Sequence, residues 1–585
     1  MFKILKNLRR KDICSVIIAV IFIAMQVWLD LKLPDYMSDI TRLVQTEGSE
    51  MHDILVAGGK MLACALGSLA LCVTVAVIAA NIASNFGAVL REKLFGKVQA
   101  FSMEEIGHFS TSSLITRSTN DVQQVQMLIV LGLQVLIKAP ITAIWAICKI
   151  HSKSWQWTTA TAVAVLVLLC VVGVVLALAF PKFRKMQALT DDLNRVTREN
   201  LTGLSVVRAY NAEKYQEDKF EVANANITNT GLFTNRVMAF MMPSIQGIMN
   251  GLSLSVYWIG AVIINQALLS EKIALFSDMV VFLSYAMQVV MSFMMLVMIF
   301  MILPRAGVAA KRINEVLDTK IRIKNGTKQD GKDSTYGEIE FKNVSFKYPD
   351  SAANVVENIS FKATKGQTVA FIGSTGCGKS TVINLIPRFY DVTGGEVLVD
   401  GINIKEYDQK SLRDKIGYVS QKAILFSGDI EGNIAYGDNG KEKVSIDDVK
   451  DAVRIAQSTD FVEKQTGTYN GYVAQGGSNF SGGQKQRLSI ARAIARKPEI
   501  LIFDDSFSAL DYKTDKALRD ALKNECKDAT KVIVAQRIGT IRDADLIIVL
   551  DNGTIAGAGT HDELMNSCEV YQQIALSQLS REELA

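Results

Sequence analysis

Nine consecutive residues in the second half of the chain contain a full match to the eight-residue phosphate-binding pattern G-x-x-x-x-G-K-[S/T], followed by a threonine. They are Gly373, Ser374, Thr375, Gly376, Cys377, Gly378, Lys379, Ser380 and Thr381, and they lie between a β-type apolar run, 368–372, and a helical apolar run, 382–386. In this context the glycines let successive N–H groups face a phosphate, and the start of the following helix adds partial positive charge. We expect Lys379 to reach the β- and γ-phosphates of a nucleotide and the Ser380 hydroxyl to contact Mg²⁺.

Other residues with suitable chemistry fit around this loop. Tyr348 ends a β-type run and is placed to stack its ring on an adenine. Asp504 ends the buried-strand pattern 500–504, where a carboxylate that organises Mg²⁺ is expected. Cys377 is interpreted as a tolerated small side chain, although a thiol reagent that modified it would block the loop.

A second anion site is predicted where a serine, two glycines and a glutamine precede an apolar helix. These residues are Ser481, Gly482, Gly483 and Gln484. Their N–H groups and the helix dipole can hold an anion. Because the phosphate loop already serves the domain's own nucleotide, this second site indicates a nucleotide held by another copy of the fold.

Length and composition limit the class of protein. A chain of 585 residues is too long for one core. Basic residues exceed acidic ones by only 4, which gives no argument for a nucleic-acid partner. The eight cysteines include no C-x-x-C pair, so neither a disulfide scaffold nor a zinc site is expected.

The first half of the chain must position the second half at a membrane. Six apolar stretches are long enough to cross a bilayer, which takes roughly 20 residues; they lie near 13–31, 54–83, 125–150, 155–180, 237–264 and 274–303. Basic residues before the first stretch predict a cytosolic N-terminus, and an even number of spans returns the C-terminus to the cytosol. The outside connections, 33–52, 151–154 and 265–272, are predicted to be short, whereas the inside connections, 87–122 and 182–235, are long and helical. Within them, 109–117 and 201–210 are interpreted as turns that dock on a partner domain or as ordinary turns between helices.

Polar groups inside the spans leave two interpretations open. Lys138 interrupts the third span, and Asp30, Gln246, Asn250, Asp278 and Gln288 add further polar groups. Such groups usually face a bundle interior or a water-filled cavity, which permits a contact with cargo. Alternatively, Lys138 lies where its helix reaches past the lipid headgroups.

The spans and the phosphate loop together define the expected architecture. We predict a transmembrane domain at 1–318, a polar linker at 319–336 and a nucleotide-binding domain at 337–585, in which β-type and helical runs alternate. The fold class is therefore a membrane α-helical domain, with six helices and long cytosolic extensions, fused to an α/β domain.

The motifs of the second domain resemble those of an ATP-binding-cassette (ABC) ATPase. They are the phosphate loop, Gln421 in Tyr418–Gln421, the signature Ser481–Gln484, Asp504, and the segment Ser508–Asp511. With six spans ahead of the cassette, the chain resembles an exporter-type half-transporter. The resemblance implies ATP and Mg²⁺ as cofactors, Gln421 as a sensor of Mg²⁺ and the γ-phosphate, and Asp511 as part of the nucleotide site. It also implies coupling helices at the two cytosolic turns and a two-chain assembly that completes each nucleotide site.

Two positions depart from the family pattern. Family members competent in hydrolysis place Glu directly after the Walker B aspartate. The Walker B position is Asp504 in this chain, and the next residue is Asp505. A carboxylate set back by roughly 1 Å can cost about 10²-fold in rate. The switch position, usually His, is Gln536 here, and glutamine can neither hold a positive charge nor shuttle a proton. Neutral drift within a working site is the alternative, but together the two changes predict a degenerate, slowly hydrolysing site and an obligate heterodimer with an unlike half-transporter.

Three functions remain possible at this point. The first is ATP-driven export of drugs, lipids or other small amphipathic compounds from a bacterial plasma membrane. The second is uptake, for example of metal chelates, by the same architecture. The third is a nucleotide-gated regulator or channel subunit. The six spans exclude soluble cassette proteins that act on DNA or ribosomes.

Overall fold

The computed structural model describes residues 2–45, 50–151, 155–268, 271–349, 351–438, 440 and 442–578, which form two compact units. The first unit comprises residues 1–99 and 111–319, and the second comprises residues 100–110 and 320–585. Parts of three predicted connections, at 46–49, 152–154 and 269–270, lie outside the described residues, as does the end of the C-terminal segment at 579–585.

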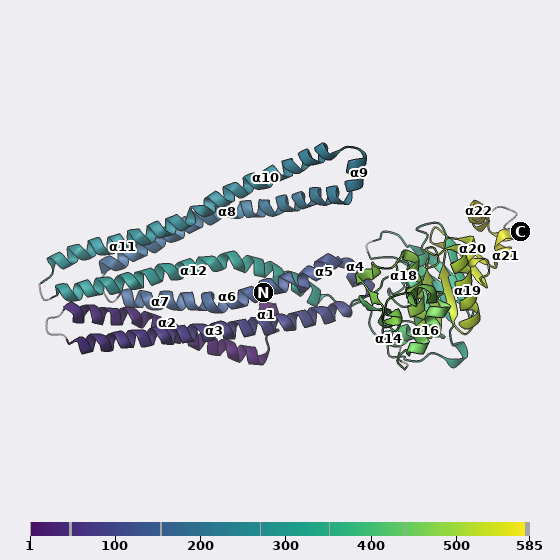
Figure 1. The fold of residues 1–585 in the computed structure, drawn as a ribbon, viewed down its shortest axis with the longest axis horizontal. Coiled ribbons are helices and arrows are strands. Elements are labelled where there is room, and N and C mark those ends of the chain that lie inside the picture. Colours follow the sequence, from purple (N-terminus) through teal and green to yellow (C-terminus); the bar gives the residue numbers. More distant parts are fainter. Residues whose placement is uncertain are drawn as a thin grey trace. The chain divides into compact units, whose positions relative to one another are not determined.

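The first unit is entirely helical in its described part (Figure 1). Its elements are α1 (Phe2–Leu5), α2 (Arg10–Gln45), α3 (Met51–Gln99), α5 (Thr111–Ser118), α6 (Asn120–Leu131), the π-helix η1 (Gly132–Ile137), α7 (Lys138–His151), α8 (Trp155–Thr202), α9 (Leu204–Ala209), α10 (Glu213–Ala239), α11 (Met241–Gln266) and α12 (Lys272–Asp318). Six helical stretches are long and apolar enough to cross a membrane, which confirms the six predicted spans. Large side chains such as Trp157, Phe282 and Tyr285 fill the core between the helices.

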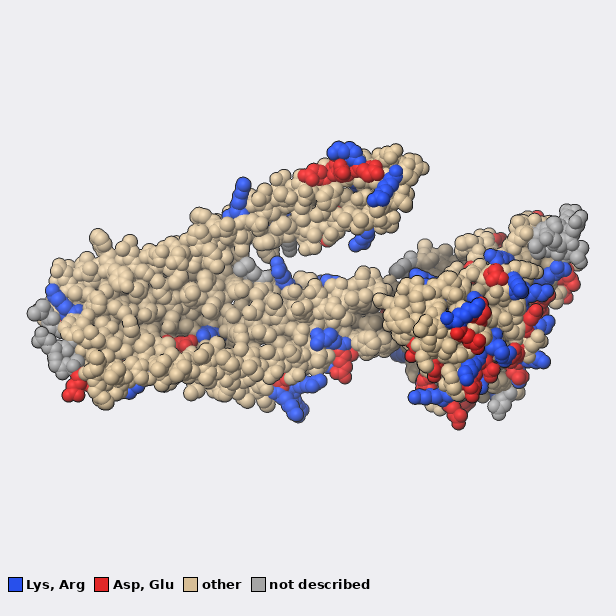
Figure 2. All heavy atoms as spheres, in the orientation of Figure 1, with Lys and Arg blue, Asp and Glu red and all other residues tan. Residues whose placement is uncertain are grey.

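The helices continue well beyond the apolar stretches. Helices α8 and α10 run side by side and are joined by α9, and charged side chains gather toward the α9 end of this hairpin (Figures 1 and 2). The helical character predicted for the long connections 87–122 and 182–235 is thereby confirmed.

One local prediction was wrong. The outside connection expected from residue 33 begins later, because α2 continues through Pro34 to Gln45. Proline removes one helical hydrogen bond, but the Tyr285 hydroxyl lies 3.0 Å from the Leu31 carbonyl oxygen and 2.6 Å from Asp35 Oδ1, so α12 holds α2 on both sides of Pro34. The segments 109–117 and 201–210 contain the short helices α5 and α9, which agrees with the helices that the family resemblance implies at these two turns.

A short helix within the first long connection between spans belongs to the second unit. Helix α4 (Met103–His108) has a complete capping box between Ser102 and Glu105. Glu105 also accepts a hydrogen bond from the backbone N–H of Arg322 at 3.0 Å, and Glu104 forms an ion pair with the Arg322 side chain. Residues 103–108 are therefore held to the rest of the second unit through Arg322.

The second unit is built on a parallel sheet with helices on both faces. The six-stranded sheet has the order β12-β11-β3-β10-β9-β6, in which only β12 is antiparallel to its neighbour. A four-stranded antiparallel sheet, β2-β1-β4-β5, and a two-stranded sheet, β7-β8, accompany it. The strands are β1 (Ile339–Phe346), β2 (Val356–Ala363), β3 (Thr368–Gly373), β4 (Gly394–Val399), β5 (Ile402–Asn403), β6 (Ile416–Val419), β7 (Gly428–Asp429), β8 (Tyr472–Val473), β9 (Ile500–Asp504), β10 (Thr530–Val534), β11 (Leu546–Asp551) and β12 (Thr554–Gly559).

The helices of this unit cover both sheet faces. They are α13 (Lys379–Leu385), α14 (Gln409–Asp414), α15 (Ile430–Ile434), α16 (Ile446–Ile455), α17 (Thr459–Val462), α18 (Gly482–Ala495), α19 (Tyr512–Glu525), α20 (Ile538–Ile541), α21 (His561–Ser567) and α22 (Glu569–Gln578), with 3₁₀ turns η2 (Asp333–Thr335), η3 (Thr468–Asn470) and η4 (Gln475–Gly477). Along β3, Val369 and Phe371 belong to one apolar core, and Ala370 and Ile372 to the other. This alternation follows from the two-residue period of a strand and explains the continuous apolar run in the sequence.

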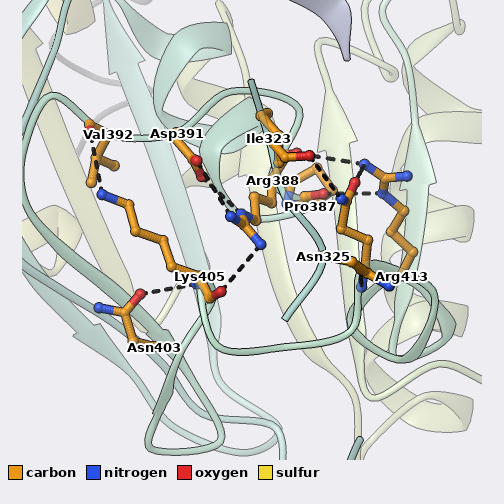
Figure 3. A network of polar contacts seen from close by, with 10 residues as sticks. Ile323, Asn325, Pro387, Arg388, Asp391, Val392, Asn403, Lys405 and Arg413 are labelled. Atoms are coloured by element: carbon orange, nitrogen blue, oxygen red, sulfur yellow. Dashed lines mark hydrogen bonds and ion pairs between the residues drawn. The ribbon is translucent and has the colours of Figure 1, made fainter. Parts of the chain in front are cut away.

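The predicted linker is bound to the second unit by side-chain amides (Figure 3). Asn325 Oδ1 accepts the Gln409 N–H at 2.7 Å, and Gln409 Oε1 accepts from Arg413 at 3.1 Å. Arg413 also donates to the Pro387 carbonyl at 3.3 Å, just beyond the helix that follows the phosphate loop. The linker is thereby connected to the region that positions the candidate site.

Candidate active site

The order of the parallel strands brings the candidate residues to one edge of the sheet. Strands β3, β10, β9 and β6 are neighbours in that order and run in the same direction. Their carboxyl ends lead to the phosphate loop, Gln536, Asp504 with Asp505, and Gln421, respectively. Ligands of open α/β sheets bind at this edge.

The phosphate loop has the backbone that its glycines permit. Gly376 and Gly378 have φ of +87° and +98°, in the left-handed region that other residues rarely adopt. A Cβ at Gly373 would lie 2.1 Å from the Leu550 carbonyl oxygen. Lys379 begins α13, and its ammonium donates to the carbonyls of Gly373 at 2.8 Å and Ser374 at 2.7 Å. The Lys379 ammonium is thus held inside the loop, in the position expected for a group that binds phosphate.

The predicted metal ligands lie together. The Ser380 hydroxyl donates to Asp504 Oδ1 at 2.8 Å. Burial raises the pKa of Asp504, the neighbouring charge of Asp505 raises it further, and the Ser380 hydrogen bond opposes both. A hydroxyl beside a buried carboxylate is the hard-oxygen donor set that Mg²⁺ prefers, and a divalent cation would favour the ionised form of Asp504.

Asp505 is held by two uncharged amides. Gln536 Nε2 donates to Asp505 Oδ2 at 2.8 Å, and Gln421 Nε2 approaches the same oxygen at 3.4 Å. The Asp505 backbone has φ of +47° and donates its N–H to the Val534 carbonyl at 3.0 Å. The two positions that depart from the family pattern are therefore in direct contact.

The predicted adenine-stacking residue lies beside the phosphate loop. The Tyr348 hydroxyl and the Thr381 hydroxyl are 3.2 Å apart. The Tyr348 ring packs edge-on against Phe346 and Tyr390, with centroids 4.9 and 5.3 Å away. These contacts fix the direction of the ring.

The signature residues form the start of α18. Ser481 and Gln484 cap this helix reciprocally: the Ser481 N–H donates to Gln484 Oε1 at 2.9 Å, and Ser481 Oγ accepts the Gln484 N–H at 3.4 Å. Asp511 caps α19 by accepting the Thr514 N–H at 3.0 Å. Within the described ranges, no hydrogen bond joins Ser481–Gln484 to the phosphate loop.

Two of the polar residues noted in the spans, Lys138 and Asp30, form an ion pair within the first unit. Lys138, directly after η1, lies 3.1 Å from Asp30, which also accepts a hydrogen bond from Ser68. Lys149 lies 2.8 Å from Asp35. Lys138 therefore connects α7 to α2.

Sequence reasoning missed one residue that contacts the site. Gln578, at the end of α22, forms two hydrogen bonds with the segment around Gln536. Its signal in the sequence was weak: it lies seven residues after Tyr571 and three after Ala575, on the face that α22 buries.

Comparisons with known proteins agree with this geometry. Residues 13–293 match the family model described as the ABC transporter transmembrane region, and residues 356–508 match the ABC transporter model. The chain is similar to an uncharacterized ABC transporter ATP-binding protein of Mycobacterium tuberculosis (strain CDC 1551 / Oshkosh), with 39% identity over 89% of this chain and 87% of the relative. It is also similar to the ATP-dependent lipid A-core flippase of Pseudomonas fluorescens (strain Pf0-1), with 31% identity over 83% of this chain and 79% of the relative.

A solved structure extends the similarity to the whole fold. The structure of a bacterial Atm1-family ABC exporter with ATP bound matches with a TM-score of 0.78 and 24% identity, covering 96% of this chain and 97% of that chain. The chain is a member of the ABC transporter family, an exporter-type half-transporter in which a multi-pass membrane region is fused to an ATP-binding ABC domain, the arrangement of an ATPase transporter.

Proposed function

We propose that this chain is the degenerate-site half of a heterodimeric exporter that moves drugs, lipids or other amphipathic compounds out of a bacterial cell. Its own Walker motifs hold ATP and hydrolyse it slowly, while Ser481–Gln484 complete a faster site on an unlike partner. Both termini lie in the cytosol.

The contact between Asp505 and Gln536 carries this proposal. The Asp505 carboxylate is one methylene shorter than glutamate, and the 2.8 Å hydrogen bond from Gln536 occupies one of its two oxygens. A general base must reach the attacking water, and a neutral amide cannot accept the proton or carry its charge. Binding and hydrolysis are thus separated: the groups that hold phosphate and metal are in place, while those that activate water are weakened.

Mg²⁺ fits the residues that the chain provides. Ser380 and Asp504 would hold the ion, with Gln421 nearby, and the ion would neutralise charge on the phosphates. The chain's own contribution is to fix these oxygens at the sheet edge and to place the Lys379 ammonium in the loop.

An unlike partner follows from the same separation. Ser481–Gln484 form a capped helix start in which the N–H groups of Gly482 and Gly483 take part in neither capping bond, and a helix start favours an anion. They share no hydrogen bond with this chain's phosphate loop in the part of the chain that the structure describes. A competent catalytic set on the partner would use this signature. Closure of the two cassettes on ATP would then pull on α3, α8 and α10, and hydrolysis at the partner's loop would reset them. Because a ligand shifts an equilibrium only by binding one state better, the slow site would act as a long-lived clamp.

Amphipathic cargo is supported by the membrane region and by one relative. Ion pairs such as Asp30–Lys138 place charge within an apolar bundle, a setting suited to molecules with a polar head and an apolar body. The lipid A-core flippase among the relatives carries its substrate class in its name.

The decisive experiment measures ATP turnover by the purified chain alone and with its co-purifying half-transporter, across a panel of amphipathic compounds. We expect the chain alone to bind ATP but turn it over slowly, and the pair to be fast and stimulated by cargo. A K379A variant, which lacks the phosphate-binding ammonium, provides the background rate. Rapid turnover by the chain alone would refute the proposal.

A further inference from the structure

The last helix of the described chain is hydrogen-bonded to the switch segment, which we define as residues 535–538. The Gln578 side chain accepts the Ile538 N–H at 2.9 Å and donates to the Gln536 carbonyl at 2.7 Å. The Gln578 amide thus forms hydrogen bonds with the backbone of the residues directly before and after Arg537.

The first of these bonds meets a local need of the switch segment. Helix α20 begins at Ile538, and its N-cap residue, Arg537, provides no side-chain cap. The first N–H groups of a helix have no partner within the helix, and an outside acceptor usually satisfies them. Gln578 supplies that acceptor from a helix 40 residues later.

The position of Gln578 is fixed by the core. Tyr571 and Ala575 on the same face of α22 are fully buried. The Tyr571 hydroxyl lies 2.8 Å from His561 Nδ1, which connects α22 to α21. The Gln578 side chain itself stays exposed to solvent, so its hydrogen bonds are of ordinary strength, yet its backbone is anchored one turn away.

The bonds of Gln578 lead directly to the candidate active site. Gln578 holds the backbone of Gln536, the Gln536 side chain donates to Asp505 at 2.8 Å, and Asp505 also meets Gln421. We propose that Gln578 is a positioning residue that holds the switch segment against Asp505, so that the last helix sets how long ATP stays at this site. The inference requires ATP binding at this site but does not depend on which site of the dimer hydrolyses.

The test compares Q578M with the matched control Q573M in the full-length chain with its partner half. Gln573 is also exposed on α22, but it donates only to Glu569 on the same helix, at 3.2 Å. The probe is 8-azido-ATP bound with Mg²⁺ and then chased with unlabelled ATP. Samples are photo-cross-linked at increasing times, and the readout is the rate at which label on this chain declines, which reports release. We expect Q578M to release it about three- to tenfold faster, the effect of one or two modest hydrogen bonds, and Q573M to match the wild type.

A third variant separates positioning from a general loss of stability. A protonated glutamate has one donor and one acceptor, like an amide, whereas an ionised glutamate only accepts. We therefore take the ratio of the Q578E release rate to the wild-type release rate at each pH. This ratio should fall toward one as the pH falls through the carboxyl pKa. The corresponding ratio for Q578M should show no such recovery. Equal release from Q578M and Q573M, or a Q578E ratio that does not change with pH, would overturn the proposal. A loss of thermal stability in Q578M that is equally large with and without ATP would also overturn the proposal.

Discussion

Restoring the two departing residues together should raise hydrolysis at this site far more than either change alone. D505E advances the carboxylate by one methylene, but Gln536, now 2.8 Å from the Asp505 carboxylate, would still bind the longer side chain with a neutral amide. Q536H supplies an imidazole but leaves the carboxylate set back from the water. Correcting a misplacement of roughly 1 Å is worth about 10²-fold. We expect each single variant to gain less than about fourfold, and D505E/Q536H to gain about 10²-fold or more.

The assay is single-turnover hydrolysis in the heterodimer, with the partner's own site disabled so that only this site reports. Residues in contact show interaction energies of about 0.5–3 kcal/mol, whereas independent sites add within about 0.5 kcal/mol. The structure therefore requires a coupling of at least about 1 kcal/mol between positions 505 and 536. Additive single effects, or a double variant no faster than the wild type, would refute the assignment of these two residues to one catalytic unit.

Three other predictions concern the second unit. Lys415 lies 2.8 Å from Asp400 and 3.0 Å from Glu499, all nearly buried, so K415M should lower the free energy of unfolding by about 3–5 kcal/mol in denaturant titration, and K415M/E499Q should recover part of it; an unchanged midpoint would contradict this. Cys377 is buried, and its sulfur lies 3.6 Å from the Lys379 ammonium. A maleimide that labels Cys377 should therefore abolish ATP binding in the wild type but not in C377S, and bound ATP should slow the labelling. Labelling at the same rate with ATP present would count against this geometry. Burial lowers the pKa of His561, and the charge of Arg542 lowers it further. The unfolded chain therefore binds the proton first as the pH falls, so the free energy of unfolding should be at its full value above about pH 6.5 and should fall below it by at most about 1.4 kcal/mol per pH unit. Urea titrations of H561Q should lack this loss.

Most of the site could be predicted from the sequence because its residues act through short local patterns. The glycine spacing of the phosphate loop specifies left-handed backbone at particular positions, and the serine and glutamine of the signature cap their own helix. The membrane spans could also be predicted from the sequence, since a run of apolar residues of sufficient length has few alternatives to a membrane helix. The end of α2 was misplaced because a proline normally stops a helix, and its support comes from Tyr285, more than 200 residues away.

The sequence by itself determined the family, the membrane class, the phosphate loop and the two unusual residues at 505 and 536. Only the tertiary structure decided that Gln536 binds Asp505, that Gln578 holds the switch segment, and that Lys138 pairs with Asp30. The physical reason is the range of the interactions. Backbone conformation and helix caps depend on neighbours within a few residues, whereas these side-chain contacts depend on strand order and helix packing, which bring distant parts of the chain together.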